Sequence, residues 1–338
     1  MSRRREWMLR LIMIAISLFV GLALAEVAAR VLYPISDGRD NVGLDGKPIK
    51  GWFEPGKVYR QVTNEYDART TITPEGHRVP GVDHGSPEVI FLGDSFTYGY
   101  GLADEQTFAS IYCNARHVTC ANLGLPGSGT KRQLERLEQF LDKYQWKPRE
   151  VKFFFFGMSC SFSAGNDFVD NYDREMFDRL PPGTKAPRGP RADRGLVERL
   201  IGLQGVLLNH SALMRVAKFQ WGPTIKALVV AAPGDERMAT ALEATKRSLA
   251  RLDDLSRSRG FAYTIYLIVP VQDIIRGSYG DTLKTLDGVS PKPAVPTAEL
   301  YLSSPKSFYY AFDGHLNPAG SSKLAQFLIA RDSVGAAR

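Results

Sequence analysis

The chain has 338 residues, with 43 Lys and Arg against 36 Asp and Glu, and 44% of its residues are hydrophobic. This apolar content suffices for a packed core, and three cysteines are too few for a disulfide scaffold, so a disordered chain and a small disulfide-rich fold are both excluded. Residues 1–34 hold five Arg and two Glu, which gives +3, and the remaining 304 residues carry the other +4 of the net charge. That distribution lacks the dense basic stripe of a nucleic-acid-binding protein, so we expect no nucleic-acid partner.

An apolar segment follows the first ten residues, which contain four arginines. Leu11–Ala25 has no charged residue, and apolar residues resume after Glu26 and continue, except for Arg30, to Tyr33. At about 1.5 Å per helical residue, residues 11–33 can cross a hydrocarbon core of ~30 Å. Because basic residues stay on the cytoplasmic side, residues 1–10 form a cytoplasmic tail and the rest of the chain is exported.

Two interpretations of this segment compete. A cleaved signal peptide would use Ala23-Leu24-Ala25 as its small-residue site. A retained signal anchor over 11–33 explains why helix-compatible sequence continues past that site without a breaker before Pro34. We favour the retained transmembrane anchor.

The sequence pattern of the exported part changes near residue 88, from irregular segments to alternating strands and helices. Residues 36–87 are rich in Gly, Pro and polar residues, with short strand-like pieces at Val58–Val62 and Thr70–Thr73, and they predict an irregular β-containing preface. Residues 88–335 alternate strands with helices, which predicts an α/β domain with a mostly parallel sheet covered on both faces. The expected strands are Val89–Leu92, Val118–Leu123, Val151–Phe156 and Phe261–Val269. The expected helices are Thr107–Ala115, Lys131–Tyr144, Asp235–Arg259 and Ala319–Arg331.

A long insertion interrupts this alternation at about 169–232. Within it, Pro181–Gly195 holds four Pro and three Gly, which predicts a loop that forms part of a lid beside the site. Seven basic residues in the insertion either meet an anionic substrate or belong to a solvated surface, and we favour the second interpretation. They are Arg174, Arg179, Lys185, Arg188, Arg191, Arg194 and Arg199.

Four short motifs follow the predicted strands or the last loop. The first strand leads into Gly93-Asp94-Ser95, and the second into a glycine-rich turn that begins at Asn122 and includes Gly127. Gly165-Asn166-Asp167 follows the third strand, and Asp313-Gly314-His315 stands near the C-terminus. Because ligands of open α/β sheets bind beyond the carboxyl ends of the strands, these motifs are expected to meet there.

Together the four motifs resemble the sequence blocks of the SGNH/GDSL hydrolase superfamily, in the same order, over residues 88–331. The resemblance implies a flavodoxin-like three-layer α/β/α fold. It also implies Ser95 as the nucleophile, His315 as the general base and Asp313 as the group that orients the base. The oxyanion hole would then combine the N–H groups of Ser95 and Gly127 with the side chain of Asn166.

Two features depart from the usual superfamily pattern. The last motif has one residue, rather than two, between Asp313 and His315, a spacing also familiar in branches that modify polysaccharides. Asn166 lies ten residues after Phe156, so Ser159 or Ser161 is an alternative occupant of its place. We expect no cofactor and no metal.

The apolar anchor and the segment Ile72–Arg78 resemble the membrane-tethered bacterial branch associated with surface-polysaccharide acyl modification. This resemblance implies an exported serine esterase at the bacterial inner membrane, with its catalytic domain in the periplasm. The substrate would be an O-acetyl or other short acyl ester of a cell-surface glycan, and polysaccharide-biosynthesis proteins would be partners. The alternatives are an O-acetyltransferase with the same triad, a lipase or thioesterase, and a non-enzymatic glycan-binding or assembly protein.

Cys113 and Cys120 lie at the end of a predicted helix and within the next predicted strand. An oxidising compartment allows them to form a disulfide, and the alternative is two small buried thiols.

Overall fold

The computed structural model describes residues 3–32, 42–43, 53–63, 65–81, 85–157, 167–178, 211–217, 235–311 and 313–336. The chain forms two compact units. One unit combines Met1–Arg39 with Arg188–Val230, and the other combines Asp40–Pro187 with Ala231–Arg338.

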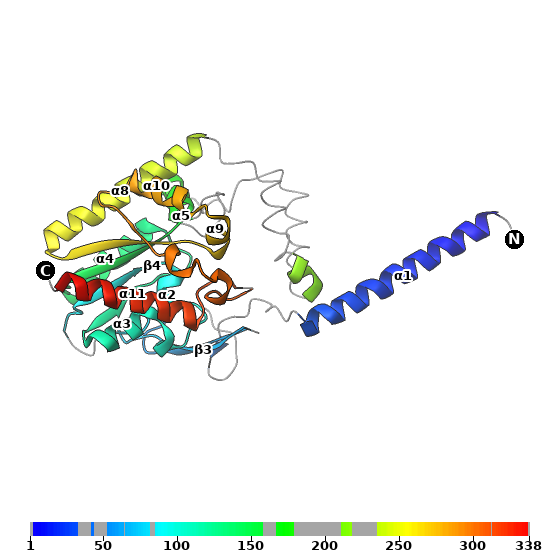
Figure 1. The fold of residues 1–338 in the computed structure, drawn as a ribbon, viewed down its shortest axis with the longest axis horizontal. Coiled ribbons are helices and arrows are strands. Elements are labelled where there is room, and N and C mark those ends of the chain that lie inside the picture. The colour runs from blue at the N-terminus through cyan, green and yellow to red at the C-terminus, as the bar shows by residue number, and fades with distance from the viewer. Residues whose placement is uncertain are drawn as a thin grey trace. The chain divides into compact units, whose positions relative to one another are not determined.

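The larger unit is organised around a five-stranded sheet (Figure 1). Its strands are β4 (Val89–Gly93), β5 (Cys120–Asn122), β6 (Glu150–Phe156), β7 (Ala262–Ile268) and β8 (Val295–Pro296). Their spatial order is β5-β4-β6-β7-β8, and every neighbouring pair is parallel. Numbered along the chain, this is the flavodoxin-like order 2-1-3-4-5, which confirms the predicted fold class.

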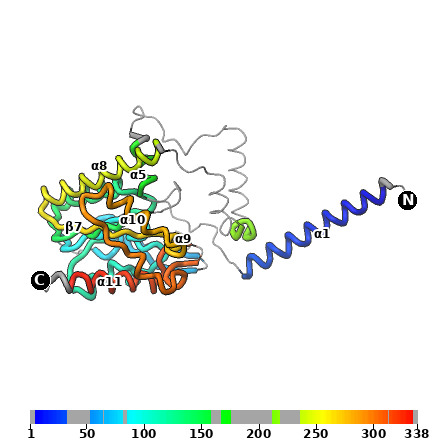
Figure 2. Tube along the Cα trace, turned by 45° about the horizontal axis from the view of Figure 1, so that its top comes forward, coloured from blue at the N-terminus to red at the C-terminus, as the bar shows by residue number. Residues whose placement is uncertain are grey.

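Helices cover both faces of this sheet (Figures 1 and 2). One face carries α4 (Thr130–Tyr144), α5 (Asp167–Asp178) and α8 (Asp235–Arg259), and the other carries α3 (Phe108–Arg116) and α11 (Pro318–Ala336). The long helices match the apolar periodicity of the sequence to within a few residues. The sequence analysis did not identify the short helices, which are α2 (Ser95–Tyr98), α9 (Val271–Arg276) and α10 (Tyr279–Asp287). Residues 167–178, at the start of the predicted insertion, form α5.

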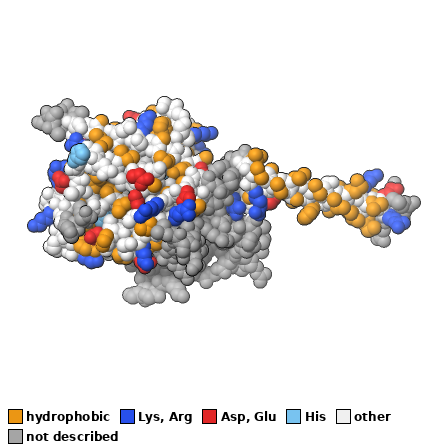
Figure 3. All heavy atoms as spheres, turned by 90° about the horizontal axis from the view of Figure 1, so that it is seen from below, with side chains coloured by type: hydrophobic (Ala, Val, Ile, Leu, Met, Phe, Trp, Pro, Cys, Tyr) orange, Lys and Arg blue, Asp and Glu red, His pale blue; other side chains and the backbone are white. Residues whose placement is uncertain are grey.

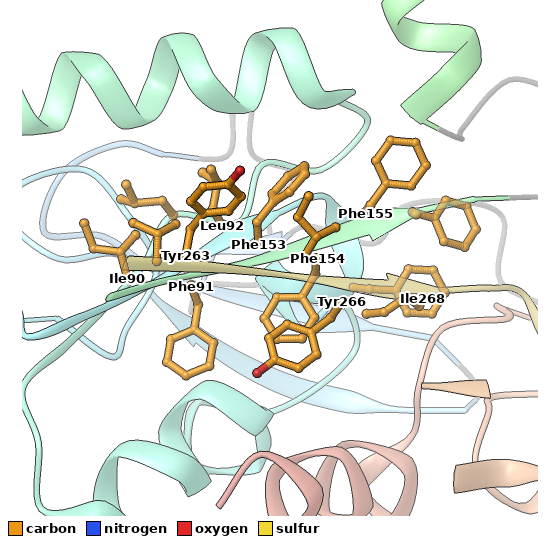
Figure 4. Close-up of a cluster of buried hydrophobic side chains, with 14 of the residues drawn as sticks. Ile90, Phe91, Leu92, Phe153, Phe154, Phe155, Tyr263, Tyr266 and Ile268 are labelled. Carbon is orange, nitrogen blue, oxygen red and sulfur yellow. The ribbon is translucent and has the colours of Figure 1, made fainter. Parts of the chain in front are cut away.

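Burial on both faces explains why the central strands are almost entirely apolar (Figure 4). Alternate side chains of each strand point to opposite sides of the sheet. Phe154 of β6 stacks on Tyr266 of β7, with ring centroids 5.0 Å apart, and it also stacks on Phe91 of β4. These aromatic contacts join the three central strands into one core, and that core fixes the strand ends from which the polar motifs emerge.

The preface contributes a separate antiparallel sheet of β1 (Val42–Gly43), β2 (Val58–Val62) and β3 (Asp67–Thr71). The strand β2 has the predicted bounds, whereas β3 begins three residues earlier than expected. Among the described residues of this unit, short 3₁₀ helices also lie at Asp104–Gln106, Ala298–Tyr301 and Pro305–Ser307.

A disulfide joins Cys113 at the end of α3 to Cys120 at the start of β5, with their Cα atoms 6.2 Å apart. Both cysteines are buried. The bridge spans the turn between the two elements, so the first of the two alternatives for this pair is the one observed.

The smaller unit contains α1 (Arg3–Leu32), whose segment Arg5–Leu32 is long and apolar enough to cross a membrane. Most of its side chains are exposed, and apolar side chains cover the helix in the space-filling view (Figure 3). Near its end, Glu26 accepts hydrogen bonds from Ser211 Oγ at 2.7 Å and from the N–H groups of Ala212 and Leu213 at 2.8 and 3.0 Å. Glu26 therefore caps the short helix at 212–217.

Candidate active site

The nucleophile candidate Ser95 is the first residue of α2 and follows the buried strand β4 almost directly. Asp94 precedes it and caps α2, because its carboxylate accepts the N–H of Phe96 at 2.9 Å. This local arrangement places Ser95 at the carboxyl end of β4, where the sequence motif predicts it. Ser95 is also the partly exposed residue of α2, since the other three side chains of the helix are buried.

His315 and Asp313 reach Ser95 from the loop before α11. The distance between His315 Nε2 and Ser95 Oγ is 2.8 Å, and His315 Nδ1 is hydrogen-bonded to Asp313 Oδ1. Gly314 between them has a φ of 84°, a left-handed conformation that glycine adopts without strain. The turn at Gly314 lets two residues separated by one position face each other, so the shortened spacing of this motif still yields a connected line of three side chains.

Asp313 and His315 shift each other's pKa values toward their charged forms. Burial alone would raise the pKa of Asp313, but the charge of His315 and its hydrogen bond hold that pKa below the ordinary value. Burial likewise opposes protonation of His315, but the hydrogen bond and charge of Asp313 outweigh it and raise the pKa of His315. The two groups therefore stabilise each other's charged forms, as a base that must take up a proton during a reaction requires.

Aromatic rings enclose the base. The ring centroids of Phe96 and Tyr100 lie 4.8 and 4.9 Å from that of His315. The turn that carries Tyr100 is held by Arg78, which is fully buried and donates to Tyr98 O at 2.7 Å and to the carbonyls of Gly99 and Leu102. Arg78 thus fixes the backbone on either side of Tyr100.

Two residues that the sequence analysis missed form hydrogen bonds with Asp313. The hydroxyl of Tyr66 donates to Asp313 Oδ2 at 3.1 Å, and the Glu65 carboxylate accepts the Asp313 N–H at 2.7 Å. Both residues stand on the turn between β2 and β3, nearly 250 positions before Asp313. No sequence motif marks them, and only the three-dimensional fold brings them to the site.

The glycine-rich loop after β5 lies against the start of α2. Asn122 donates to Thr97 O at 3.0 Å, and the N–H of Leu125 donates to Gly93 O at 2.8 Å. A Cβ on Gly124 would lie 2.2 Å from Tyr98 N, so this close approach requires glycine. Within the described ranges, the N–H groups of Ser95 and Gly127 donate to no protein acceptor. Both remain able to donate to a ligand at this edge of the sheet.

The first turn of α5 holds the far end of the same loop. Asp170 accepts the N–H of Gly129, and Asn171 accepts the N–H of Lys131 at 3.1 Å. Asp167 accepts Gln133 Nε2 at 3.1 Å, and the same amide donates to Ser128 O at 2.8 Å. The loop is therefore fixed from both sides, by α2 and by α5.

Several sequence expectations concern residues that the structure does not describe. Asn166, Ser159 and Ser161 fall outside the described residues, as do most basic residues of the insertion at 169–232. Among the described residues, no group of three or more His, Cys, Asp and Glu side chains is arranged to hold a metal ion.

No protein-family model matches the chain, and no curated protein matches it. Similar solved structures include a carbohydrate esterase described as having divergent catalytic and non-catalytic binding functions, with 12% identity over 84% of this chain and 87% of that one and a TM-score of 0.38. Another is a family two carbohydrate esterase from Clostridium thermocellum in complex with cellohexaose, with 12% identity, coverage of 77% and 68%, and a TM-score of 0.37. A third is an acetyl xylan esterase from the rumen bacterium Butyrivibrio proteoclasticus, with 12% identity, coverage of 75% and 65%, and a TM-score of 0.36. At these values the likeness assigns neither a family nor an activity to this chain.

Proposed function

We propose that this chain is an exported, membrane-anchored serine esterase of the SGNH/GDSL type. Its substrate is an O-acetyl or other short acyl ester of a cell-surface glycan. The observation that carries the proposal is the hydrogen-bonded line from Ser95 through His315 to Asp313, which has the connectivity of a nucleophile, a base and an orienting acid. The order of the sequence motifs and the resemblance of the preface support the family and the substrate class.

In the proposed reaction, Ser95 Oγ attacks the ester carbonyl carbon while its proton passes to His315 Nε2. The carbonyl oxygen becomes an oxyanion that accepts hydrogen bonds from the N–H groups of Ser95 and Gly127, with Asn166 as the proposed third donor. The carbon–oxygen bond to the sugar then breaks, and His315 gives its proton to the departing sugar oxygen. Water attacks the acyl-Ser95 ester in the same way, which releases the carboxylic acid and restores the serine.

Three features support export and anchoring. The helix α1 is long and apolar enough to cross a membrane, and arginines precede its apolar part. The Cys113–Cys120 disulfide is typical of an oxidising compartment. The helix α1 runs without a break from Arg3 to Leu32, across the alternative cleavage site after Ala25. We therefore propose that α1 is retained as a single-pass anchor of the inner membrane.

The nucleophile is tested by labelling the full-length protein in detergent with a serine-directed fluorophosphonate. Wild type should carry one label, at Ser95, and should hydrolyse p-nitrophenyl acetate. Ser95→Ala should abolish both, whereas Ser248→Ala should leave both intact, because the Ser248 hydroxyl only donates to the Ala244 carbonyl within α8. A folded wild-type protein that is not labelled and cleaves no short-chain ester would exclude the esterase.

An acetylated glycan then identifies the acceptor. Free acetate indicates hydrolysis, and transfer of the acetyl group to a second sugar would instead indicate an acyltransferase that uses the same acyl-serine.

Retention of α1 is tested with a C-terminally tagged chain. The tagged protein should sediment with membranes and keep its N-terminal residues, whereas a soluble form that begins at Glu26 would establish cleavage.

A further inference from the structure

The turn between β2 and β3 contacts the acid of the proposed triad at two points. Tyr66 donates its hydroxyl proton to Asp313 Oδ2 at 3.1 Å, while His315 occupies Oδ1 of the same carboxylate. Glu65 accepts the main-chain N–H of Asp313 at 2.7 Å. Each carboxylate oxygen of Asp313 thus has its own partner, and the backbone that carries the carboxylate has a third.

The turn itself is held firmly against the site. The Tyr66 side chain is buried, and its ring packs on Tyr310 with centroids 4.8 Å apart and edge-on against Tyr100 at 6.2 Å. Gln61 of β2 accepts the N–H of Gly101 at 2.8 Å. The β2–β3 hairpin is therefore docked on both sides of the base, against the turn that carries Tyr100 and against the loop that carries Asp313.

We propose that Tyr66 and Glu65 are positioning residues that orient Asp313 toward His315, so that the small antiparallel sheet completes the catalytic machinery. This inference rests on the proposed esterase function. Asp313 Oδ1 accepts the main-chain N–H of His315 at 3.2 Å besides its bond with His315 Nδ1, and the hydroxyl of Tyr66 adds a restraint on Oδ2 that limits rotation about the Cβ–Cγ bond. Glu65 restrains the main chain of the same residue. Both residues act through Asp313 rather than on the substrate.

The hydrogen bond from Tyr66 also has an electrostatic consequence. It stabilises the Asp313 carboxylate and draws negative charge toward Oδ2, away from the oxygen that faces His315. Without the hydroxyl, more of that charge remains on Oδ1 and holds the proton on His315 more firmly. The base would then become available only at a higher pH.

The experiment compares Tyr66→Phe with Tyr59→Phe in the full-length protein in detergent. Tyr59 lies on β2 of the same sheet and is also buried, but its hydroxyl accepts the N–H of Glu54, away from the triad. Rates are divided by the number of sites that fluorophosphonate titrates, so that a partly unfolded preparation does not distort them. For Tyr66→Phe we expect kcat for p-nitrophenyl acetate to fall roughly tenfold with little change in KM, because the variant loses a hydrogen bond to a charged group that does not touch the substrate.

The pH profile separates a positioning role from a merely structural one. The acid limb of kcat/KM should move to higher pH in Tyr66→Phe and stay in place in Tyr59→Phe. Glu65→Ala should lower kcat, and Glu65→Gln, whose amide oxygen can still accept the Asp313 N–H, should recover much of the loss.

An active Tyr66→Phe enzyme with unchanged kcat and an unchanged acid limb would overturn this inference and leave the esterase proposal standing. A wild-type protein without a label at Ser95 would overturn both, so the two failures are distinguishable.

Discussion

Carboxyl groups lie on both sides of Ser95, and their pKa values move in opposite directions. On the base side, burial favours the neutral form of Asp313, but the charge of His315 overcomes it and lowers the pKa. On the side of the glycine-rich loop, burial raises the pKa of Asp94 to about 6, and burial together with the charges of Asp94 and Asp170 raises that of Asp167 well above its ordinary value. The same residue type is therefore tuned by its partners, since Asp313 faces a cation and Asp167 faces amides and other acids.

This difference suits the proposed chemistry. A negative charge on Asp313 stabilises the imidazolium that forms when Ser95 loses its proton. A fixed negative charge beside the glycine-rich loop would instead repel the oxyanion of the proposed reaction, and this repulsion would be strong in a buried site. The raised pKa of Asp167 favours its neutral form, which could still accept hydrogen bonds from Gln133 and from the Phe156 N–H and so support the loop.

The largest effect is expected from removing the base. His315→Asn keeps a polar side chain but cannot accept the Ser95 proton. Turnover of p-nitrophenyl acetate should fall on the order of 10⁵-fold or more, and fluorophosphonate labelling of Ser95 should collapse. The control is His117→Asn, because His117 is an exposed residue that follows the last turn of α3. Substantial labelling of His315→Asn would contradict the assigned role.

The second prediction uses one substitution on both sides of the site. Asp313→Asn should lower kcat on the order of 10³-fold or more, because the amide cannot stabilise the imidazolium and favours the wrong tautomer. Asp167→Asn should cost less than about tenfold, because its amide oxygen can replace one of the two accepting oxygens of Asp167 and the substitution introduces no charge. Equal losses in the two variants, measured by steady-state kinetics, would show that the charge of Asp313 matters no more than that of Asp167.

Some residues of the candidate site could be predicted from the sequence, and others could not. Ser95, His315 and Asp313 lie in short linear motifs whose order along the chain is informative, and long apolar periodicities located the main strands and helices. Tyr66 and Glu65 lie in an irregular segment and reach Asp313 only through tertiary packing, so no local pattern identifies them. The strand β8 has two residues and α9 has six, which is too short for periodicity to register. The role of Asn166 stays a prediction.

The third prediction concerns the pH dependence of stability. A carboxyl group whose pKa is raised on folding binds more protons in the folded state than in the unfolded state. Its contribution to the free energy of unfolding therefore falls as pH rises from about 4 through the folded pKa. Asp167→Asn removes this loss, so its melting temperature relative to wild type should be higher at pH 8 than at pH 5. We expect a relative gain of at least about 2 °C in thermal melts of the detergent-solubilised protein. A relative melting temperature that is independent of pH would show that Asp167 is not held neutral.

The smallest effect is expected at Gly127 in the glycine-rich loop after β5. Gly127 has a φ of 65°, and no atom lies within 4 Å of where its Cβ would be. Gly127→Ala therefore costs backbone strain of about 1 kcal/mol rather than a steric clash, and kcat should fall less than tenfold. Gly56→Ala is a matched control, with a φ of 72° and equally open space in the turn before β2. Equal kcat values for the two variants would argue against the Gly127 N–H as an oxyanion donor.

The contact of Glu26 with the helix at 212–217 has a consequence for how the chain is made. It joins positions that are 185 to 187 residues apart, so the capping residue is synthesised long before the N–H groups that it caps. At about 5–20 residues per second, the ribosome takes roughly 10–40 s to cover that interval. Throughout this time the last turn of α1 has Arg30, at 2.8 Å, as the nearby partner of Glu26. The contact at the end of α1 is therefore completed late in biosynthesis, and a chain that stops before Ser211 never completes it.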